Sequence, residues 1–243
     1  MRKALACIAL VVLAMTGSAC DVGPVTLTEI ETGPTVTEEI NVPVPDAGTA
    51  SEVEISMGGG VLSIGAGDVD GLVKGTVAYN VPELEPSVQI SGNRVIIQQG
   101  DIEGKKLPVG NWSGVENRWD LILGKAPMVL TVNAGAAQAK LTGLADLAAS
   151  KITMRGGAGD FTLDFGGDLK QDMQVAIDAG AAQVTIIVPE GTAAELTFQG
   201  TLVDIDAGGA WQKSGSTYVL EGEGPRITFL IRMGVGDINL RNH

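Results

Sequence analysis

A pattern of alternating hydrophobic and polar residues recurs five times along the chain, each time around a glycine. With that glycine as position zero, apolar or small residues stand at −5, −3 and −1. A second Gly or Ala follows at +2, and apolar residues follow at +4 and +6. The zero-position glycines are Gly58, Gly135, Gly157, Gly180 and Gly234.

The alternation predicts two short strands in each copy, because residues two apart lie on the same face of a strand. The step from −1 to +2 is odd, so a straight strand would turn its second half inside out. A bulge or corner at the glycine restores the inward face, and glycine tolerates the backbone angles of a corner. Each copy is therefore predicted to be two strands that meet at a bend and face one core.

The spacing of the copies predicts the architecture. From Gly135 onward the intervals are 22, 23, 28 and 26 residues, counting a partial copy that ends at Gly208. Such a period, built from strand pairs, is typical of an all-β stacked solenoid, similar to a single-stranded β-helix. A β-sandwich is the alternative. Residues 134–149 are rich in Ala, but we predict strand there because Gly135 and Gly143 interrupt a helix.

The first nineteen residues have the features of a signal peptide. A basic start precedes a twelve-residue apolar run, Ala4–Met15, which is too short to cross a bilayer as a helix. Residues 16–20 (TGSAC) resemble a bacterial lipobox, in which Cys20 is lipidated and becomes the first mature residue. Gly17 stands where such boxes usually carry a large aliphatic residue. Cleavage after Ala19 without lipidation, giving a secreted protein, is the alternative.

The rest of the chain divides into a tether and a domain. Residues 20–50 are rich in Thr, Glu and Pro, a composition that suits an extended linker. Within them, Ile40–Val44 is a candidate edge strand. Residues 51–243 are predicted to form the β-solenoid domain.

The net charge and the counts of Cys and His limit the classes of partner and site that we expect. Removal of residues 1–19 leaves 14 Lys and Arg against 29 Asp and Glu, a net charge of −15, with Cys20 as the only cysteine. This charge argues against nucleic acid and anionic lipid as partners, so membrane attachment is expected through the lipid anchor alone. The single histidine is the last residue, His243, which argues against His-based catalysis and metal sites. No cofactor is expected.

Four segments resemble the bacterial toast-rack proteins, which are related to cell-wall-active-antibiotic-response and putative-adhesin domains. The segments are 58–89, 117–144, 152–167 and 174–198, and they carry the glycine motifs together with Asn80, Pro86, Trp119 and Pro189-Glu190-Gly191. The resemblance covers about Glu52–Leu240. It implies a stacked β-solenoid outside the cytoplasmic membrane, often on lipoproteins or membrane stress-response proteins, and it implies no catalytic residues.

The sequence Gly-x-Gly-Asp occurs three times and ends at Asp68, Asp160 and Asp237. Repeated Gly-Asp turns bind calcium in some β-rolls, which makes these aspartates candidate calcium ligands. Such rolls require a tandem nine-residue period, and the copies at Gln138 and Gln183 lack the carboxylate. We therefore expect solvated turn carboxylates and no metal site.

The sequence offers candidates for two further kinds of site, a catalytic site and a sugar-binding site. Polysaccharide cleavage requires two or three carboxylates on one face. The candidates, Asp160, Asp164, Asp178 and Asp237, stand at different motif offsets, so we predict that the protein is not an enzyme. Exposed Trp pairs can stack on sugars. Trp119 alternates with strand residues and is expected in the core, whereas Trp112 is open to either role.

These observations predict a non-catalytic adhesion or interaction module, lipid-anchored outside the cytoplasmic membrane, with an envelope glycan or an envelope protein as its partner. The alternative is a scaffold or sensor of an envelope-stress response that binds another protein. The ends of a solenoid expose unpaired strand edges, which must be capped or used for partners. An interface at one end would favour a protein partner, and binding along the polar flank would favour a glycan.

Overall fold

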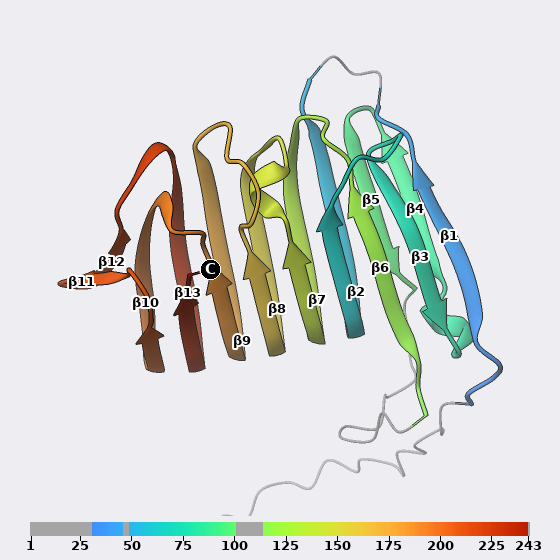
Figure 1. The fold of residues 1–243 in the computed structure, drawn as a ribbon. Helices are drawn as coiled ribbons and strands as arrows, with labels where there is room; N and C mark the ends of the chain where they lie inside the picture. The colour runs from blue at the N-terminus through green and yellow to red at the C-terminus, as the bar shows by residue number, and fades with distance from the viewer. Residues whose placement is uncertain (1–30, 46–48, 101–113, 243) are drawn as a thin grey trace, which may run out of the picture.

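The structure, a computed structural model, describes residues 31–45, 49–100 and 114–242, which form one large β-sheet (Figure 1). The strands are β1 (Val36–Val42), β2 (Ser51–Ala66), β3 (Val73–Tyr79), β4 (Pro86–Ser91), β5 (Arg94–Gln99), β6 (Asn117–Leu123), β7 (Met128–Thr142), β8 (Ala149–Asp164), β9 (Met173–Ile187), β10 (Gly191–Ala207), β11 (Gln212–Ser214), β12 (Thr217–Leu220) and β13 (Gly222–Arg241). Two 3-10 turns, η1 (Pro82–Leu84) and η2 (Leu144–Asp146), complete the described elements. The sheet is open, with the order β1-β3-β6-β2-β7-β8-β9-β13-β10-β12-β11, and the β4–β5 hairpin joins it through β2.

Six long strands, here called rungs, lie side by side in the order β2, β7, β8, β9, β13, β10 and run parallel (Figure 1). Their register brings the −1 positions of the copies together. Ala134 pairs with Met57 on one side and Gly156 on the other, and Ala179 pairs with Gly156 and Met233. The five zero-position glycines therefore form a single column, here called the glycine column. The predicted stacked all-β architecture is confirmed.

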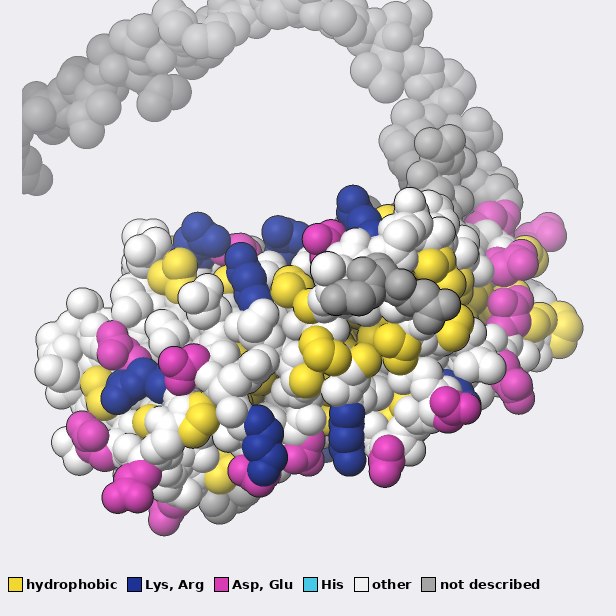
Figure 2. Space-filling view, turned by 90° about the horizontal axis from the view of Figure 1, so that it is seen from above, with side chains coloured by type: hydrophobic (Ala, Val, Ile, Leu, Met, Phe, Trp, Pro, Cys, Tyr) yellow, Lys and Arg dark blue, Asp and Glu magenta, His cyan; other side chains and the backbone are white. Residues whose placement is uncertain are grey.

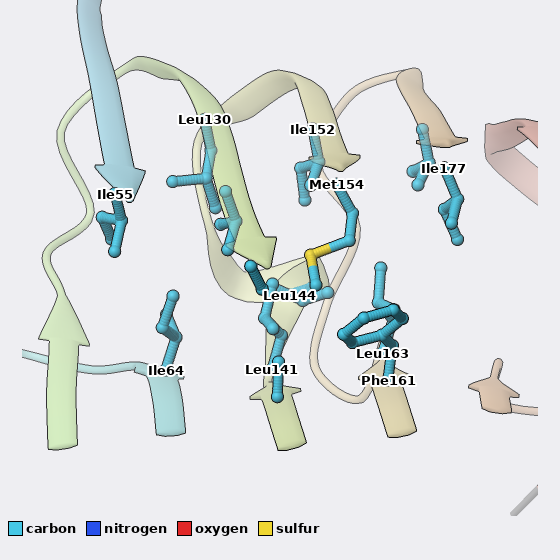
Figure 3. Packing of buried hydrophobic residues seen from close by; sticks show 14 of the residues in the cluster. Ile55, Ile64, Leu130, Leu141, Leu144, Ile152, Met154, Phe161, Leu163 and Ile177 are labelled. Atoms are coloured by element: carbon cyan, nitrogen blue, oxygen red, sulfur yellow. The ribbon is translucent and has the colours of Figure 1, made fainter. Parts of the chain in front are cut away.

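Each of the five rungs that carry a zero-position glycine doubles back on itself at that residue. In β2 the buried side chains before the bend stand at odd positions, such as Ile55 and Met57, and those after it at even positions, such as Leu62 and Ile64. Figure 3 shows Ile55 and Ile64 pointing toward one another from the two halves of the rung. The change of parity thus keeps both halves facing one core, as the motif predicted.

The core runs between the two halves of every rung. Met154 and Phe161, from the two halves of β8, approach each other there (Figure 3), and both are almost fully buried. Further along the stack, Phe165 and Phe229 pack edge to face with ring centroids 5.1 Å apart. One continuous hydrophobic cluster joins all six rungs, so neighbouring rungs complete one another's core.

Glycine is required at the column because adjacent rungs approach closely, and not because of a left-handed backbone. A Cβ added to Gly135 would lie 2.3 Å from the carbonyl oxygen of Gly58. The corresponding distance is 2.5 Å at Gly157, 2.6 Å at Gly180 and 2.8 Å at Gly234, each to the glycine of the preceding rung. None of these glycines has a positive φ. The backbone freedom that the sequence suggested for position zero therefore belongs elsewhere in the bend.

A positive φ occurs instead at position +2, and only in every other one of the first five rungs. Gly60, Gly159 and Gly236 have φ of +135°, +143° and +134°, and they stand in β2, β8 and β13. The rungs between them, β7 and β9, carry Ala137 and Ala182, and no non-glycine residue of the described chain has a positive φ. Two bend conformations therefore alternate along the stack, which explains why the motif accepts either Gly or Ala at +2.

On the edge away from β7, the two halves of the first rung, β2, pair with different strands. The first half of β2 pairs with β5 and the second half with β6. Side chains bridge the bend there, since Asn117 Nδ2 donates to the carbonyl oxygen of Gly59 (2.6 Å) and to Gln99 Oε1 (2.8 Å). Trp119 Nε1 donates to Asn117 Oδ1 (2.9 Å) and its side chain is fully buried, which confirms the prediction that Trp119 lies in the core.

The sixth rung departs from the expected spacing, and its place in the stack was not predicted. The partial copy ending at Gly208 marks no bend, because β10 ends at Ala207 and the residue aligned beside Gly234 is Thr201. The order of the rungs also departs from the order of the chain, since β13 inserts between β9 and β10. The bend of β10 lies at Gly200–Leu202, where the Gly-x-Gly pattern is absent.

Two segment assignments are resolved by the structure. Residues 134–142 belong to β7, as predicted, but the prediction of strand is wrong for Leu144–Asp146, which form the 3-10 turn η2 before β8 begins. Strand β1 pairs with β3 along its whole length, although it lies within residues 20–50. The folded domain therefore begins before residue 51 and includes part of the segment assigned to the tether.

Candidate functional site

The outer surface of the bends is the most regular surface that the described chain offers. Three parallel lines of residues run along the rungs there: the glycine column, which crosses five of the six rungs, and a row of mostly polar residues on either side of it, which crosses all six. The row at position −2, here called the −2 row, consists of Ser56, Asn133, Arg155, Asp178, Arg232 and Gln199. The row at position +3, here called the +3 row, consists of Val61, Gln138, Asp160, Gln183, Asp237 and Asp204.

Side chains of the −2 row bond to one another from rung to rung. Asn133 Nδ2 donates to Ser56 Oγ (2.9 Å), and Arg155 Nη1 donates to Asn133 Oδ1 (3.4 Å). Arg232 holds Asp178 with two bonds, Nε to Oδ1 at 2.5 Å and Nη2 to Oδ2 at 3.1 Å. These contacts fix the direction of polar groups that would otherwise sample several rotamers.

Shallow hollows follow the glycine column on both sides. One, of about 690 Å³, lies over the first three rungs between Ser56 and Gly157, and a second, of about 650 Å³, continues it from Arg155 to Gly234. Both are lined by residues of the −2 row and the glycine column. A third hollow, of about 570 Å³, lies on the other flank and is lined by Gln138 and Asn117 among others. Together the first two form a groove along the stack, here called the bend groove.

In β7, β8 and β9 the floor of the bend groove is made by small residues at position −1, Ala134, Gly156 and Ala179. Position +1, on the other side of the glycine column, carries Ala136, Ala158 and Ala181 in the same rungs, all exposed, and the first two line the third hollow. Larger side chains appear only toward β10, where Val235 and Leu202 are 46% and 71% exposed. A flat floor between two polar rows lets an extended ligand approach the backbone closely.

The structure separates the aspartates considered as calcium ligands. Asp160 and Asp237 lie in the +3 row two rungs apart, a backbone separation of about 9.6 Å. Asp68 follows the end of β2 on the loop side, with a carboxylate oxygen 4.0 Å from Lys125 Nζ. Within the described ranges, no group of three His, Cys, Asp or Glu side chains is placed to hold a metal ion.

The remaining candidates have separate environments. Asp164 lies near the end of β8 and accepts a bond from the backbone N–H of Gly166, whereas Asp178 is held in the −2 row. Cys20 and Trp112 lie outside the described residues. The sequence predicted a polar flank but did not single out the −2 row, although a polar residue stands two places before every zero-position glycine.

Among the described residues, the one titratable group with a clearly shifted pKa lies away from the bends. Burial, the hydrogen bond to Glu38 and the charges of Glu38 and Glu85 raise the pKa of Tyr79 to about 12. The Tyr79 hydroxyl donates to Glu38 Oε1 at 2.5 Å and joins β3 to the edge strand β1. This group stabilises one end of the sheet and is not part of the bend groove.

Comparison with known proteins identifies the family. The N-terminal domain family of the toast-rack proteins, DUF2154, matches residues 31–187, which is more than half of the chain. The chain belongs to this family. This toast-rack protein matches no curated protein. No helix among the residues that the structure describes has the length and apolar character needed to cross a membrane.

A solved structure shares the fold of this toast-rack protein. A crystal structure of a "putative cell adhesion protein" from Clostridium sporogenes has a TM-score of 0.78 at 21% identity, over 86% of this chain and all of the other. A "putative adhesin" from Bacteroides fragilis and a "putative lipid binding protein" from Parabacteroides distasonis, each 13% identical, have TM-scores of 0.33 and 0.27. They cover 85% and 86% of this chain and 97% of their own chains. At these identities the likeness to the Clostridium protein establishes the fold alone.

Proposed function

We propose that this toast-rack protein is a non-catalytic interaction module of the cell envelope, held outside the cytoplasmic membrane by lipid on Cys20. The observation that carries the proposal is the bend groove, which repeats the same polar and small positions on successive rungs. The Clostridium sporogenes structure is named a "putative cell adhesion protein", which points in the same direction. The lipobox-like residues 16–20 supply the anchor.

The groove suits an extended, hydroxyl-rich polymer, so an envelope glycan is the proposed ligand. Rungs repeat about every 4.8 Å, and each presents a hydroxyl, amide, carboxylate or guanidinium group beside the flat floor. The groups of the −2 row already bond to one another, so little side-chain entropy is lost when a ligand binds. Affinity would build from many equivalent weak contacts along the stack.

The carboxylates near the groove support binding without catalysis. The carboxylate of Asp178 forms an ion pair with Arg232. Asp160 and Asp237 are both exposed, whereas a general acid and a general base work in a cleft that excludes water and gives them different environments. Asp160 and Asp237 lie on the same open surface, so neither has the enclosed environment of a catalytic acid or base.

Co-sedimentation with insoluble cell-wall material tests the proposal. We expect saturable pelleting of the purified protein and no new reducing ends in the same tubes. Asn133→Ala and Arg155→Ala should each weaken pelleting about tenfold, the size of one lost hydrogen bond. Lys140→Ala is the matched control, since Lys140 is exposed on β7 but does not line the groove. Absence of pelleting would refute the glycan ligand, and new reducing ends would refute the non-catalytic assignment.

A second candidate function is a scaffold or sensor of an envelope-stress response that binds another protein. The observation in its favour is a free strand edge at one end of the stack. Beyond Thr197, no strand of the described chain pairs with the outer edge of β10. Localised binding at that end, with no binding along the groove, would favour this function.

A further inference from the structure

The stack ends on a rung that is only half covered. Strand β12 pairs with β10 over Ala194–Thr197 alone, whereas β13 pairs with the other edge of β10 from Gly191 to Ala207. The second half of β10 therefore has a strand neighbour on one side only among the described residues. Its outer edge has the geometry that accepts an added strand.

Apolar side chains of this half-rung are left partly uncovered. Val203, Ile205 and Ala207 point into the end of the core and are only partly buried. In the neighbouring rung β13, Ile238 and Leu240 occupy the positions of Ile205 and Ala207 and are fully buried. One further strand would complete the burial that every interior rung receives.

The same edge is acidic. Asp204 and Asp206 alternate with the apolar residues and are exposed, and Asp237 lies in register beside Asp204. Asp206 is paired with Arg241 at 2.7 Å, while Asp204 and Asp237 have no ion pair within the described part of the chain. A strand that adds here meets at least two unneutralised carboxylates.

Charge argues against self-association as the way this edge is covered. Two β10 edges placed together would bring Asp204 and Asp206 near their own copies. The opposite end of the stack is also acidic, with Glu38 and Glu39 on the edge strand β1. Figure 2 shows, from the loop side, acidic side chains gathering toward both ends of the molecule. The chain's own residues 20–30 contain no Lys or Arg and so lack the complementary charge.

We propose that the outer edge of β10 binds an extended segment of a partner protein in which apolar and basic residues alternate. The backbone of the segment pairs with residues 198–207, its apolar side chains cover Val203 and Ile205, and its basic side chains meet Asp204 and Asp237. This proposal rests on the second candidate function, for which it names the kind of segment that the free edge would bind, and it does not depend on glycan binding.

Binding of synthetic peptides to the purified protein tests this inference. A ten-residue peptide that alternates Val and Lys should bind, measured by fluorescence anisotropy, and one that alternates Val and Glu should not. Asp204→Lys should weaken binding at least tenfold, because it reverses the charge at the edge. Asp160→Lys is the matched control: it makes the same change in the +3 row, on a rung paired on both sides, and should change affinity less than twofold.

Hydrogen exchange locates the bound peptide. We expect the Val–Lys peptide to protect amides within residues 198–207 and not those of β9. Failure of this peptide to bind, equal binding of the Val–Glu peptide, equal weakening by both variants, or protection elsewhere would each overturn the proposal. A dimer in sedimentation velocity that Asp204→Lys dissolves would overturn it too, because a second copy would then occupy the edge. None of these results depends on glycan pelleting.

Discussion

At the scale of single residues, the bend divides its requirements between two glycine positions. Position zero needs the absence of a side chain, because the carbonyl of the preceding rung occupies that space. Position +2 needs a positive φ in every other rung. The two needs are independent, so substitutions at the two positions destabilise the bend for different reasons.

Gly157→Ala should lower the free energy of unfolding by about 1–3 kcal/mol, because the added Cβ would lie 2.5 Å from the Gly135 carbonyl oxygen. For a chain of this size that corresponds to a fall in Tm of about 2–4 °C per kcal/mol. Gly65→Ala is the matched control, since its Cβ would meet only Thr142 Oγ1 at 3.7 Å. Urea unfolding measures both, and equal stability of the two variants would contradict the close approach of the rungs.

The raised pKa of Tyr79 predicts that the folded protein loses stability at high pH. Its pKa rises from 10.0 in the unfolded chain to about 12 in the folded protein, so the neutral phenol is favoured by folding. The stabilisation is complete below pH 10 and is lost as the pH rises from 10 to about 12. Spectrophotometric titration of phenolate, combined with unfolding at each pH, should show this step. The step should disappear in Tyr79→Phe, and an unchanged profile would refute the assignment.

At the scale of elements, the rung is the unit that the sequence predicted best. Period-two alternation, the odd step at the bend and the recurrence of glycine all arise from one physical need, which is to keep two half-strands facing one core. The sequence therefore predicted five of the six rungs. The sixth was misplaced because β10 has Thr201 where the other rungs have the zero-position glycine. The distance from an added Cβ to the carbonyl oxygen of the preceding rung rises from 2.3 Å at Gly135 to 2.8 Å at Gly234. The requirement for glycine is therefore weakest at this end of the stack.

The half-covered rung β10 should also be the least protected. Amides of Leu202–Ala207 should exchange about tenfold or more faster than those of Ala182–Ile187, because β9 is paired on both sides and this half of β10 on one. Hydrogen exchange of the free protein measures the difference. Equal protection would mean that the edge of β10 is already covered, and it would contradict the free edge on which the peptide proposal rests.

At the scale of the whole molecule, family and fold were within reach of the sequence, but the candidate site was not. The glycine motifs and the composition identified a stacked all-β domain because they report on local strand geometry. The −2 row and the bend groove depend on which rungs become neighbours. The insertion of β13 between β9 and β10 brings Arg232 beside Asp178, 54 residues apart in the chain. No local pattern contains that information.

Membrane attachment through Cys20 makes a prediction for the intact protein. Expressed in a bacterial host with its leader, the protein should partition into the detergent phase of Triton X-114 and incorporate labelled fatty acid. Cys20→Ser should move it to the aqueous phase, because no basic patch replaces the acyl chains. Cys7→Ser, which changes the other cysteine of the chain, should leave partitioning unchanged. A Cys20→Ser protein that stays in the detergent phase would contradict lipid anchoring.

The most direct test of the central claim is a titration of the 15N-labelled protein with soluble cell-wall glycan fragments, followed by amide chemical shifts. The account predicts saturable shifts along the bend groove, at Asn133, Arg155 and the glycine column, with the β10 edge unaffected. Shifts confined to residues 198–207, or no shifts at all, would contradict the claim that the toast-rack bends form a glycan-binding surface.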